Sequence, residues 1–200
     1  MTDLKKDKLN GVYRRYADLF KHEKIVFGTG DIDSSIMFIG EAPGRDELKK
    51  GEPFVGKAGE KFGGILMALD LAREDVFITN TIKYGLRKTD PVTGRQSNRP
   101  VRKEEMIMNR PFLLEEIGCI GPDLIVTLGA VPLKTLILDL DLRISDYTGK
   151  CLKYADMLVF PLFHPAALIY DPSLVSVFDT DLKALRQIIG NHCKSHAGVI

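Results

Sequence analysis

Cysteine is scarce in this sequence. The 200 residues include three cysteines, Cys119, Cys151 and Cys193, which lie far apart. Because none of them forms a CxxC pair or stands near a histidine at metal-ligand spacing, they indicate neither a zinc site nor a disulfide framework. Unlinked thiols are typical of a reducing compartment, so we expect a cytoplasmic protein.

Long apolar runs and a strong net charge are also missing. No apolar stretch approaches the length of a membrane span, and Met1–Asp7 lacks the apolar segment of a signal peptide. The formal net charge of +1 does not indicate a polyanion partner for the chain as a whole. The hydrophobic content of 44% is enough for one core. We therefore expect a single domain over residues 1–200, a monomer without a membrane partner.

Short apolar runs alternate with amphipathic stretches along the chain. We expect strands at Ile25–Phe27, Ile36–Ile39, Val76–Thr79 and Asp123–Leu128, and a hairpin formed by Lys150–Tyr154 and Met157–Phe160. We expect helices over residues 8–21, 58–71, 104–117 and 129–138, and a C-terminal helix capped by Asp171-Pro172-Ser173. This alternation predicts an α/β fold with three α/β/α layers around a central, mostly parallel sheet.

The connection after the run Ile36–Ile39 is unusual. It begins with Gly40, Pro43 and Gly44, a composition that makes a tight turn with free backbone N–H groups. A charged loop follows, with Phe54 in a position where we expect it to be exposed. An ordinary strand-to-helix connection is one interpretation. The length of the segment favours a functional loop, because long ordered loops usually carry function.

Three polar residues follow buried strands. Glu41 comes after the first of these strands, Asn80 ends the second and His164 follows the last. In a mostly parallel sheet, ligands bind beyond the carboxyl ends of the strands. We therefore expect the three side chains to converge on an enzyme site.

Residues 83–103 are expected to be irregular, and they are strongly basic. One acid, Asp90, stands among seven cations: Lys83, Arg87, Lys88, Arg95, Arg99, Arg102 and Lys103. The segment is either a solvated loop or an arm that binds phosphates.

An ordered series of motifs covers most of the chain, from about Tyr13 to Ile189. The motifs are Val26-Phe27-Gly28, Gly40-Glu41-Ala42-Pro43-Gly44 with Glu47, Gly51, Pro53-Phe54-Val55-Gly56-Lys57-Ala58-Gly59, Ile78-Thr79-Asn80 with Lys83, Asn98-Arg99, Leu128-Gly129 and Phe163-His164-Pro165-Ala166-Ala167-Leu168. With these motifs the chain resembles the uracil-DNA glycosylase superfamily, most closely its family four. The resemblance implies an enzyme of base excision repair. Such an enzyme flips uracil out of single- or double-stranded DNA and hydrolyses its N-glycosidic bond, leaving an abasic site.

The resemblance also implies roles for individual residues. The Phe54 ring would hold the flat base, the Asn80 carboxamide would bond to N3–H and O4 of uracil, and a neutral His164 N–H would stabilise charge at O2. Each residue has a structural alternative: a loop residue that closes the core, a turn asparagine and a packed histidine, respectively. The expected catalytic residues are His164, Glu41 and Asn80, and the expected substrate-binding residues are Gly40, Ala42, Gly44, Glu47, Phe54 and Asn80.

Two of the implied roles are less specific. Glu41 orders the attacking water or balances charge on the sugar, and the relatives with a dedicated water-activating aspartate carry it where this chain has Ala42. Leu168 resembles the apolar wedge that such enzymes insert into DNA, with the first turn of a helix as the alternative. The expected DNA-binding residues are Lys57, Arg95, Arg99, Pro165, Ala166 and Leu168.

The chain departs from family four at the positions of a cofactor. The resemblance implies an iron–sulfur cluster on four cysteines, but the corresponding residues here are Tyr13, Tyr16, Tyr84 and Asn109. We therefore expect no cluster and no other cofactor, and we expect the tyrosines to close this region by packing. Tyr170 also replaces a usual arginine, and the basic loop is longer than in the family pattern.

Three other functions are compatible with the sequence. The same pocket could serve a glycosylase for another deaminated base, such as hypoxanthine or xanthine. A catalytically inactive protein that binds damaged DNA is the second alternative, although binding alone does not need Asn80 and His164 together. A small-nucleotide hydrolase is the third, but it would not need an extended basic arm.

Overall fold

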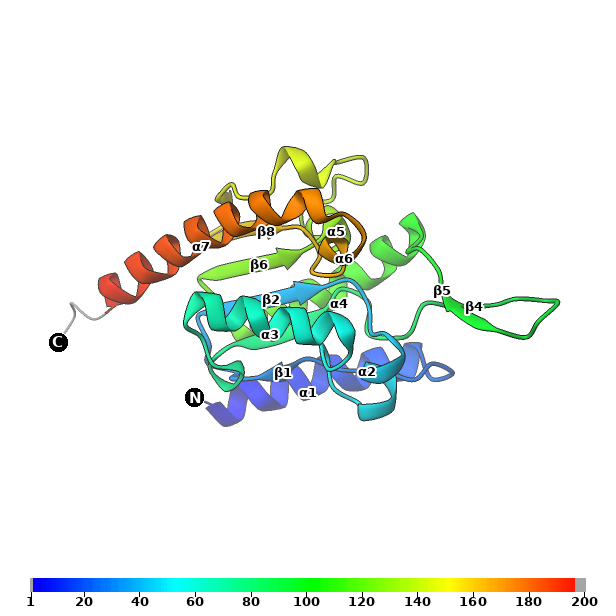
Figure 1. Cartoon of the computed structure of the whole chain (residues 1–200). Coiled ribbons are helices and arrows are strands. Elements are labelled where there is room, and N and C mark those ends of the chain that lie inside the picture. The colour runs from blue at the N-terminus through cyan, green and yellow to red at the C-terminus, as the bar shows by residue number, and fades with distance from the viewer. Residues whose placement is uncertain (1, 197–200) are drawn as a thin grey trace.

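The structure is a computed structural model in which residues 2–196 are described, apart from the side chains of Thr2, Ile169 and residues 192–196. The thiol of Cys193 thus lies outside the described part. At the centre is a six-stranded sheet of order β1-β3-β2-β6-β8-β7 (Figure 1). Its strands are β1 (Thr29–Gly30), β2 (Ile36–Gly40), β3 (Phe77–Asn80), β6 (Leu124–Leu128), β7 (Leu152–Tyr154) and β8 (Met157–Leu162).

The inner strands of this sheet run parallel. β3, β2, β6 and β8 are parallel to one another, and the edge strands β1 and β7 are antiparallel to their neighbours. All residues of β2 and β6 are buried, which explains why these strands are continuous apolar runs in the sequence. The parallel arrangement brings the carboxyl ends of four strands to the same edge of the sheet.

Helices cover both faces of the sheet. α3 (Lys57–Leu69) and α7 (Val175–His196) pack on one face, whereas α1 (Thr2–Leu19), α4 (Lys103–Ile120) and α5 (Ala130–Ile137) pack on the other. Each face of the sheet has its own hydrophobic core, and successive residues of β2 point to opposite faces. Met37 packs in the core on the side of α4, and Phe38 packs in the core on the side of α3. The predicted three-layer α/β/α fold is therefore confirmed (Figure 1).

The predicted strand at Ile25–Phe27 is wrong. Ile25 forms only an isolated bridge to Tyr84, and the Phe27 ring stacks on Tyr13 at 4.1 Å between centroids. The edge strand comes slightly later, where Thr29 pairs with Ile78. Apolar composition identified a buried segment here but could not tell ladder pairing from side-chain packing.

The basic segment and the charged loop contain more structure than we expected. Within residues 83–103, β4 (Arg87–Thr89) and β5 (Gln96–Asn98) form an antiparallel hairpin that projects from the body of the protein (Figure 1). The loop after β2 contains the short helix α2 (Arg45–Lys50). Short helical turns complete the fold at α6 (Ala167–Tyr170), Arg73–Asp75, Ile144–Asp146 and Pro172–Leu174. Within residues 2–196, no helix is both long and apolar enough to cross a membrane.

Candidate active site

A cleft of about 740 Å³ opens at the carboxyl edge of the parallel strands. Four segments contribute to its wall: the connection after β2, the end of β3, the hairpin β4–β5 and the turn after β8. The lining includes nine of the residues predicted from the sequence, namely Ala42, Gly44, Glu47, Phe54, Lys57, Asn80, Arg95, His164 and Ala166. The fold thus brings together side chains from distant parts of the chain.

Asn80 and Phe54 meet at Gly40, the last residue of β2. A Cβ atom at position 40 would lie 2.4 Å from Oδ1 of Asn80 and 2.5 Å from Cζ of Phe54. Gly40 therefore does not line the cleft, but it allows the carboxamide and the ring to approach the backbone from two sides. The residues of this corner are packed too tightly to be rearranged independently.

Phe54 is 6% exposed, so the expectation of an exposed aromatic is wrong. Its ring packs on Phe62 at 4.7 Å between centroids, and it still borders the cleft. Its backbone has a φ of 52°, a left-handed conformation that a bulky residue adopts only when its surroundings enforce it. Phe54 therefore closes the core, as one interpretation of the sequence held, and it also lines the cleft.

Two charged side chains hold the backbone around Phe54 in this left-handed conformation. Oε1 of Glu47 accepts hydrogen bonds from the backbone N–H groups of Val55, at 3.1 Å, and Gly56, at 2.8 Å. Arg73 donates from the other side to the carbonyl groups of Phe54 and Pro53. Glu47 was predicted to bind substrate, and its contacts give it a role in holding the loop. Arg73 carries no motif in the sequence, so its role could not be predicted.

His164 is held with a defined tautomer. The N–H of Ala166 donates to Nδ1 at 3.2 Å, so the proton of the neutral ring lies on Nε2. Burial lowers the pKa of His164 below its ordinary value of about 6.5, which keeps the imidazole neutral at neutral pH. The ring lines the cleft, and Nε2–H is its remaining donor.

A glycine that we did not predict as a site residue supports His164. Gly129 follows β6 with a φ of +96°, and a Cβ atom there would lie 3.1 Å from Cβ of His164. Its N–H donates to the carbonyl of Leu162 in β8 at 2.8 Å. A side chain at position 129 would both strain the backbone and push His164 away. The sequence offered one sign of this role, a glycine directly after a buried strand.

Glu41 lies beside the cleft and is not among the residues that line it. Its carbonyl accepts from the N–H of Ile82 at 3.0 Å, which ties the turn after β2 to the end of β3. Burial raises the pKa of the Glu41 carboxyl above its ordinary value. Glu41 directly follows β2, as expected, but unlike Phe54, Asn80 and His164 it does not line the cleft.

Leu168 does not form an exposed wedge. It lies in the single turn of α6, half-buried, and packs against the core on the α7 side of the sheet. Pro165 is buried and does not line the cleft either. Tyr170, at the end of α6, is 86% exposed and lines the cleft. Among the described side chains of α6, Tyr170 is therefore the one that is both exposed and in the lining of the cleft.

Arg99 is engaged within the protein. Its guanidinium donates to both carboxylate oxygens of Glu105, at 2.8 and 2.6 Å, and holds the pKa of that carboxyl below its usual range. Lys103 forms an ion pair with Asp141 at 2.9 Å. Arg87 and Arg95 instead line the cleft from the hairpin. The basic run thus contains two kinds of cation, and the sequence alone could not distinguish them.

The residues at the four cluster positions do not fit an iron–sulfur cluster. Tyr13, Tyr16, Tyr84 and Asn109 offer no thiolates. Tyr16 and Tyr84 belong to one buried apolar cluster, and Tyr13 stacks on Phe27, which packs against that cluster. Tyr16 lies 4.5 Å from Phe20 between ring centroids, and its hydroxyl donates to Oδ1 of Asn109 at 2.5 Å. Tyr84 packs on Phe20 at 4.9 Å. As the sequence predicted, the tyrosines close this region by packing.

Purified protein is accordingly expected to contain no stoichiometric iron or acid-labile sulfide. The reason is chemical: phenols held neutral by burial and a carboxamide do not replace four thiolates around iron. The measurement is metal and sulfide analysis of protein produced without oxygen in iron-supplemented medium, together with its visible absorption spectrum. Stoichiometric iron with sulfide would contradict the prediction.

The fold and the cleft together define an α/β protein that presents an aromatic face, a carboxamide and a neutral imidazole at the carboxyl edge of its sheet. The chain belongs to the uracil-DNA glycosylase superfamily, because the model of that family, described as "Uracil DNA glycosylase superfamily", matches residues 27–188. It is thus a DNA glycosylase, a hydrolase that acts on N-glycosidic bonds.

Individual relatives agree with this assignment. The chain is 34% identical over 183 residues to a type-4 uracil-DNA glycosylase of Saccharolobus solfataricus, covering 86% of this chain and 80% of the relative. It is 35% identical over 184 residues to the type-4 enzyme of Archaeoglobus fulgidus, with 88% of both chains covered. For the type-4 enzyme of Sulfurisphaera tokodaii, the identity is 36% over 169 residues, 80% of this chain and 73% of the relative. The resemblance inferred from the motifs is confirmed.

Proposed function

We propose that the protein excises uracil from DNA by hydrolysis and leaves an abasic site. The observation that carries this proposal is the convergence of Phe54, Asn80 and His164 on one cleft, with Nε2–H as the free donor of the histidine. A flipped uracil stacks on the Phe54 ring. The carboxamide of Asn80 donates to O4 and accepts from N3–H, a pairing that cytosine cannot satisfy.

The chemistry follows from where charge develops. As the N-glycosidic bond breaks, negative charge grows on the departing base and positive charge on the sugar. The Nε2–H group of the neutral His164 ring donates a hydrogen bond to O2 and so stabilises the uracil anion. Because the ring is already held in place, it does not have to reorganise in the transition state. The Glu41 carboxyl, near the turn after β2, balances charge on the sugar or orders the water. A strong base is not required, because bond breaking precedes attack.

One incubation tests this function against the alternatives. Single- and double-stranded oligonucleotides, each with one uracil, hypoxanthine or xanthine, are incubated with the protein and then treated with alkali. We expect strand cleavage at uracil only after the alkali treatment, because a monofunctional glycosylase leaves the backbone intact. Cleavage at hypoxanthine or xanthine instead would favour another base. The absence of cleavage at every base would contradict a glycosylase and would favour a non-catalytic DNA-binding protein or a nucleotide hydrolase.

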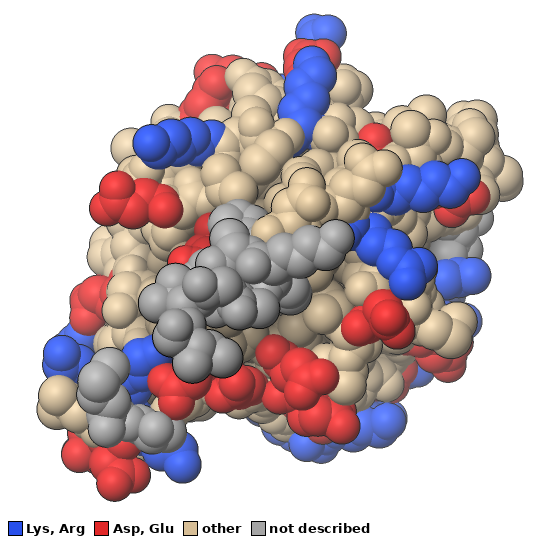
Figure 2. All heavy atoms as spheres, turned by 90° about the vertical axis from the view of Figure 1, so that its left-hand side faces the viewer, with Lys and Arg blue, Asp and Glu red and all other residues tan. Residues whose placement is uncertain are grey.

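We place the DNA strand along the hairpin side of the cleft. Arg87 and Arg95 line the cleft there, and Lys88 is exposed on β4 between them in the hairpin. Among the described residues, none of these three cations lies within ion-pair distance of a carboxylate. Figure 2 shows the side of the molecule away from the hairpin, where basic and acidic residues are interspersed.

Replacing Arg87, Lys88 or Arg95 by glutamine is expected to lower the affinity for DNA and to make that affinity less dependent on salt concentration. Each lost phosphate contact should reduce the slope of log affinity against log salt by about 1. The measurement is equilibrium binding to one oligonucleotide across a salt series. Lys153→Gln, which removes an exposed charge on the edge strand β7, is the matched control and should keep the wild-type slope. Unchanged slopes in all three hairpin variants would identify the hairpin as a solvated surface.

A further inference from the structure

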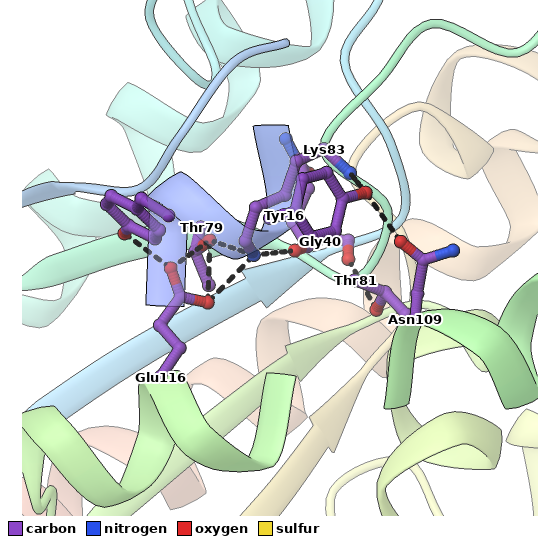
Figure 3. A network of polar contacts seen from close by, with 9 residues as sticks. Tyr16, Gly40, Thr79, Thr81, Lys83, Asn109 and Glu116 are labelled. Atoms are coloured by element: carbon purple, nitrogen blue, oxygen red, sulfur yellow. Dashed lines mark hydrogen bonds and ion pairs between the residues drawn. The ribbon is translucent and has the colours of Figure 1, made fainter. Parts of the chain in front are cut away.

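Two opposite charges are fully buried beneath the end of β3. The side chains of Lys83 and Glu116 are 1% and 0% exposed, and their charged atoms lie 2.8 Å apart (Figure 3). Taking both charges out of water has a large desolvation cost, and apolar residues of similar volume are often at least as stabilising. Stability alone therefore does not explain the pair. Its position suggests what else it does.

All three protons of the Lys83 ammonium have acceptors. Nζ donates to Oε2 of Glu116 at 2.8 Å, to Oγ1 of Thr79 at 3.1 Å and to the backbone carbonyl of Asn80 at 2.9 Å. A lysine has three donors, so its geometry is fully specified. Asn80 is the last residue of β3, where strand carbonyls lose their ladder partners. The ammonium thus clamps the backbone of the residue proposed to recognise the base.

Glu116 is fixed from the helical side. Its carboxylate accepts from the Tyr13 hydroxyl at 2.6 Å and from the Thr79 hydroxyl at 3.1 Å. Burial, reinforced by the Glu116 charge, raises the pKa of the Tyr13 phenol well above its usual value, so it stays a neutral donor. The Tyr16 hydroxyl accepts from the N–H of Lys83 at 2.9 Å while it donates to Asn109 (Figure 3). Lys83 is therefore held at both its backbone and its ammonium group.

The Asn80 side chain has little room to compensate for a backbone shift. Its Oδ1 lies against Gly40, and the Phe54 ring closes the same corner. A displacement of the Asn80 backbone must therefore move the carboxamide relative to a bound base. Misplacement of a recognition group by about 1 Å can cost about 10²-fold in rate.

We propose that the buried Lys83–Glu116 pair positions Asn80 for recognition of the base. The pair is linked through Tyr13, Tyr16 and Asn109 to the region where the family resemblance implies a cluster, so a polar network anchors the recognition strand there. Lys83 and Glu116 touch neither base nor sugar and act only through Asn80. The proposal rests on the proposed function for the identity of the base, but the clamp on Asn80 does not depend on it.

The test removes both charges at once, because removing one would leave the other buried and unpaired. In Lys83→Met with Glu116→Gln, Tyr13 and Thr79 keep a neutral hydrogen-bond partner, and we expect the variant to fold. Its kcat/KM for uracil should fall about 10²-fold, and its preference for uracil over cytosine should narrow. The matched control is Lys5→Met with Asp33→Asn, which removes the 2.9 Å ion pair at the start of α1, away from the cleft. The control should keep the wild-type preference.

A second readout does not depend on activity. In nitrogen-15-labelled protein, the side-chain amide signals of Asn80 are assigned by their loss in Asn80→Asp. They should shift or broaden in the Lys83/Glu116 double variant and stay in place in the Lys5/Asp33 control. If both the Asn80 signals and the base preference match the wild type in a folded double variant, the positioning role is refuted. If the wild type excises no uracil, the proposed function fails, while the amide signals still decide whether the pair holds Asn80.

Discussion

His164→Ala is expected to slow uracil excision by roughly 10²–10³-fold, the scale of losing one preorganised donor to a developing oxyanion. Its affinity for DNA should change little, because the lost interaction strengthens mainly as the bond breaks. The measurements are the single-turnover excision rate and equilibrium binding to the same oligonucleotide. His22→Ala is the matched control, since His22 is exposed and does not line the cleft. Excision by His164→Ala at the wild-type rate would refute the mechanism.

The pH dependence of the same reaction reports the state of the ring. Protonation of Nδ1 would turn an acceptor into a donor that faces the N–H of Ala166. Because the pKa of His164 is lowered, the neutral ring should persist below pH 6.5, and the rate should fall only when pH drops through that lowered pKa. Glu41, whose pKa is raised, could add a second acid limb. The fall in excision rate at low pH that remains in the Glu41→Gln variant is therefore due to protonation of His164.

The parallel core of this fold is predictable because burial on two faces leaves a simple pattern. Ile36–Ile39 and Asp123–Leu128 appear as continuous apolar runs, and both become central strands, β2 and β6. The strand at the edge of the sheet is harder to predict from the sequence. At β1, Gly30 approaches the carbonyl of Val76 so closely that a Cβ atom would lie 1.9 Å from it. This contact depends on partners distant in sequence, whereas the apolar run Ile25–Phe27 packs through side chains instead.

The hairpin was missed because its strands have no apolar alternation. Only its turn has a local cause: Oδ1 of Asp90 accepts from the N–H groups of Val92 and Thr93, each at 2.8 Å, and Gly94 takes a φ of +67°. Asp-Pro followed by a nearby glycine is a turn pattern, and it could have indicated the hairpin. Polar strands beside such a turn are easily taken for an irregular loop.

The candidate site also contains residues that the sequence could predict and residues that it could not. Asn80 and His164 could be placed from the sequence because each follows directly on a buried strand. Glu116 could not, since it lies in the middle of the helix α4, outside every sequence motif, and pairs with Lys83 across 33 positions. The number of cations in residues 83–103 was visible in the sequence, but which of them face the cleft depends on partners such as Glu105 and Asp141. Composition gives charge, and only the fold decides which charges are free.

Asn80→Asp is expected to abolish discrimination in favour of uracil. A carboxylate repels O4 of uracil, whereas it can accept a hydrogen bond from the amino group of cytosine. Sites built around substrate hydrogen bonds discriminate by about 10⁴ or more, so the ratio of kcat/KM for uracil over cytosine should fall on the order of 10⁴. The measurement is single-turnover excision from matched oligonucleotides that carry uracil or cytosine at one position.

The added charge itself must be separated from the altered recognition. Asn98→Asp provides the matched control, because Asn98 lines the same cleft from β5 and undergoes the same chemical change. Its carboxylate should weaken DNA binding in a salt-dependent way while it preserves the ratio between uracil and cytosine. A wild-type ratio in Asn80→Asp would show that Asn80 does not recognise the base edge. If the ratio of kcat/KM for uracil over cytosine fell equally in both variants, the cause would be the added charge in the cleft and not altered recognition of the base. The reason is that Asn80, and not Asn98, lies against Gly40 together with Phe54, where a base would be recognised.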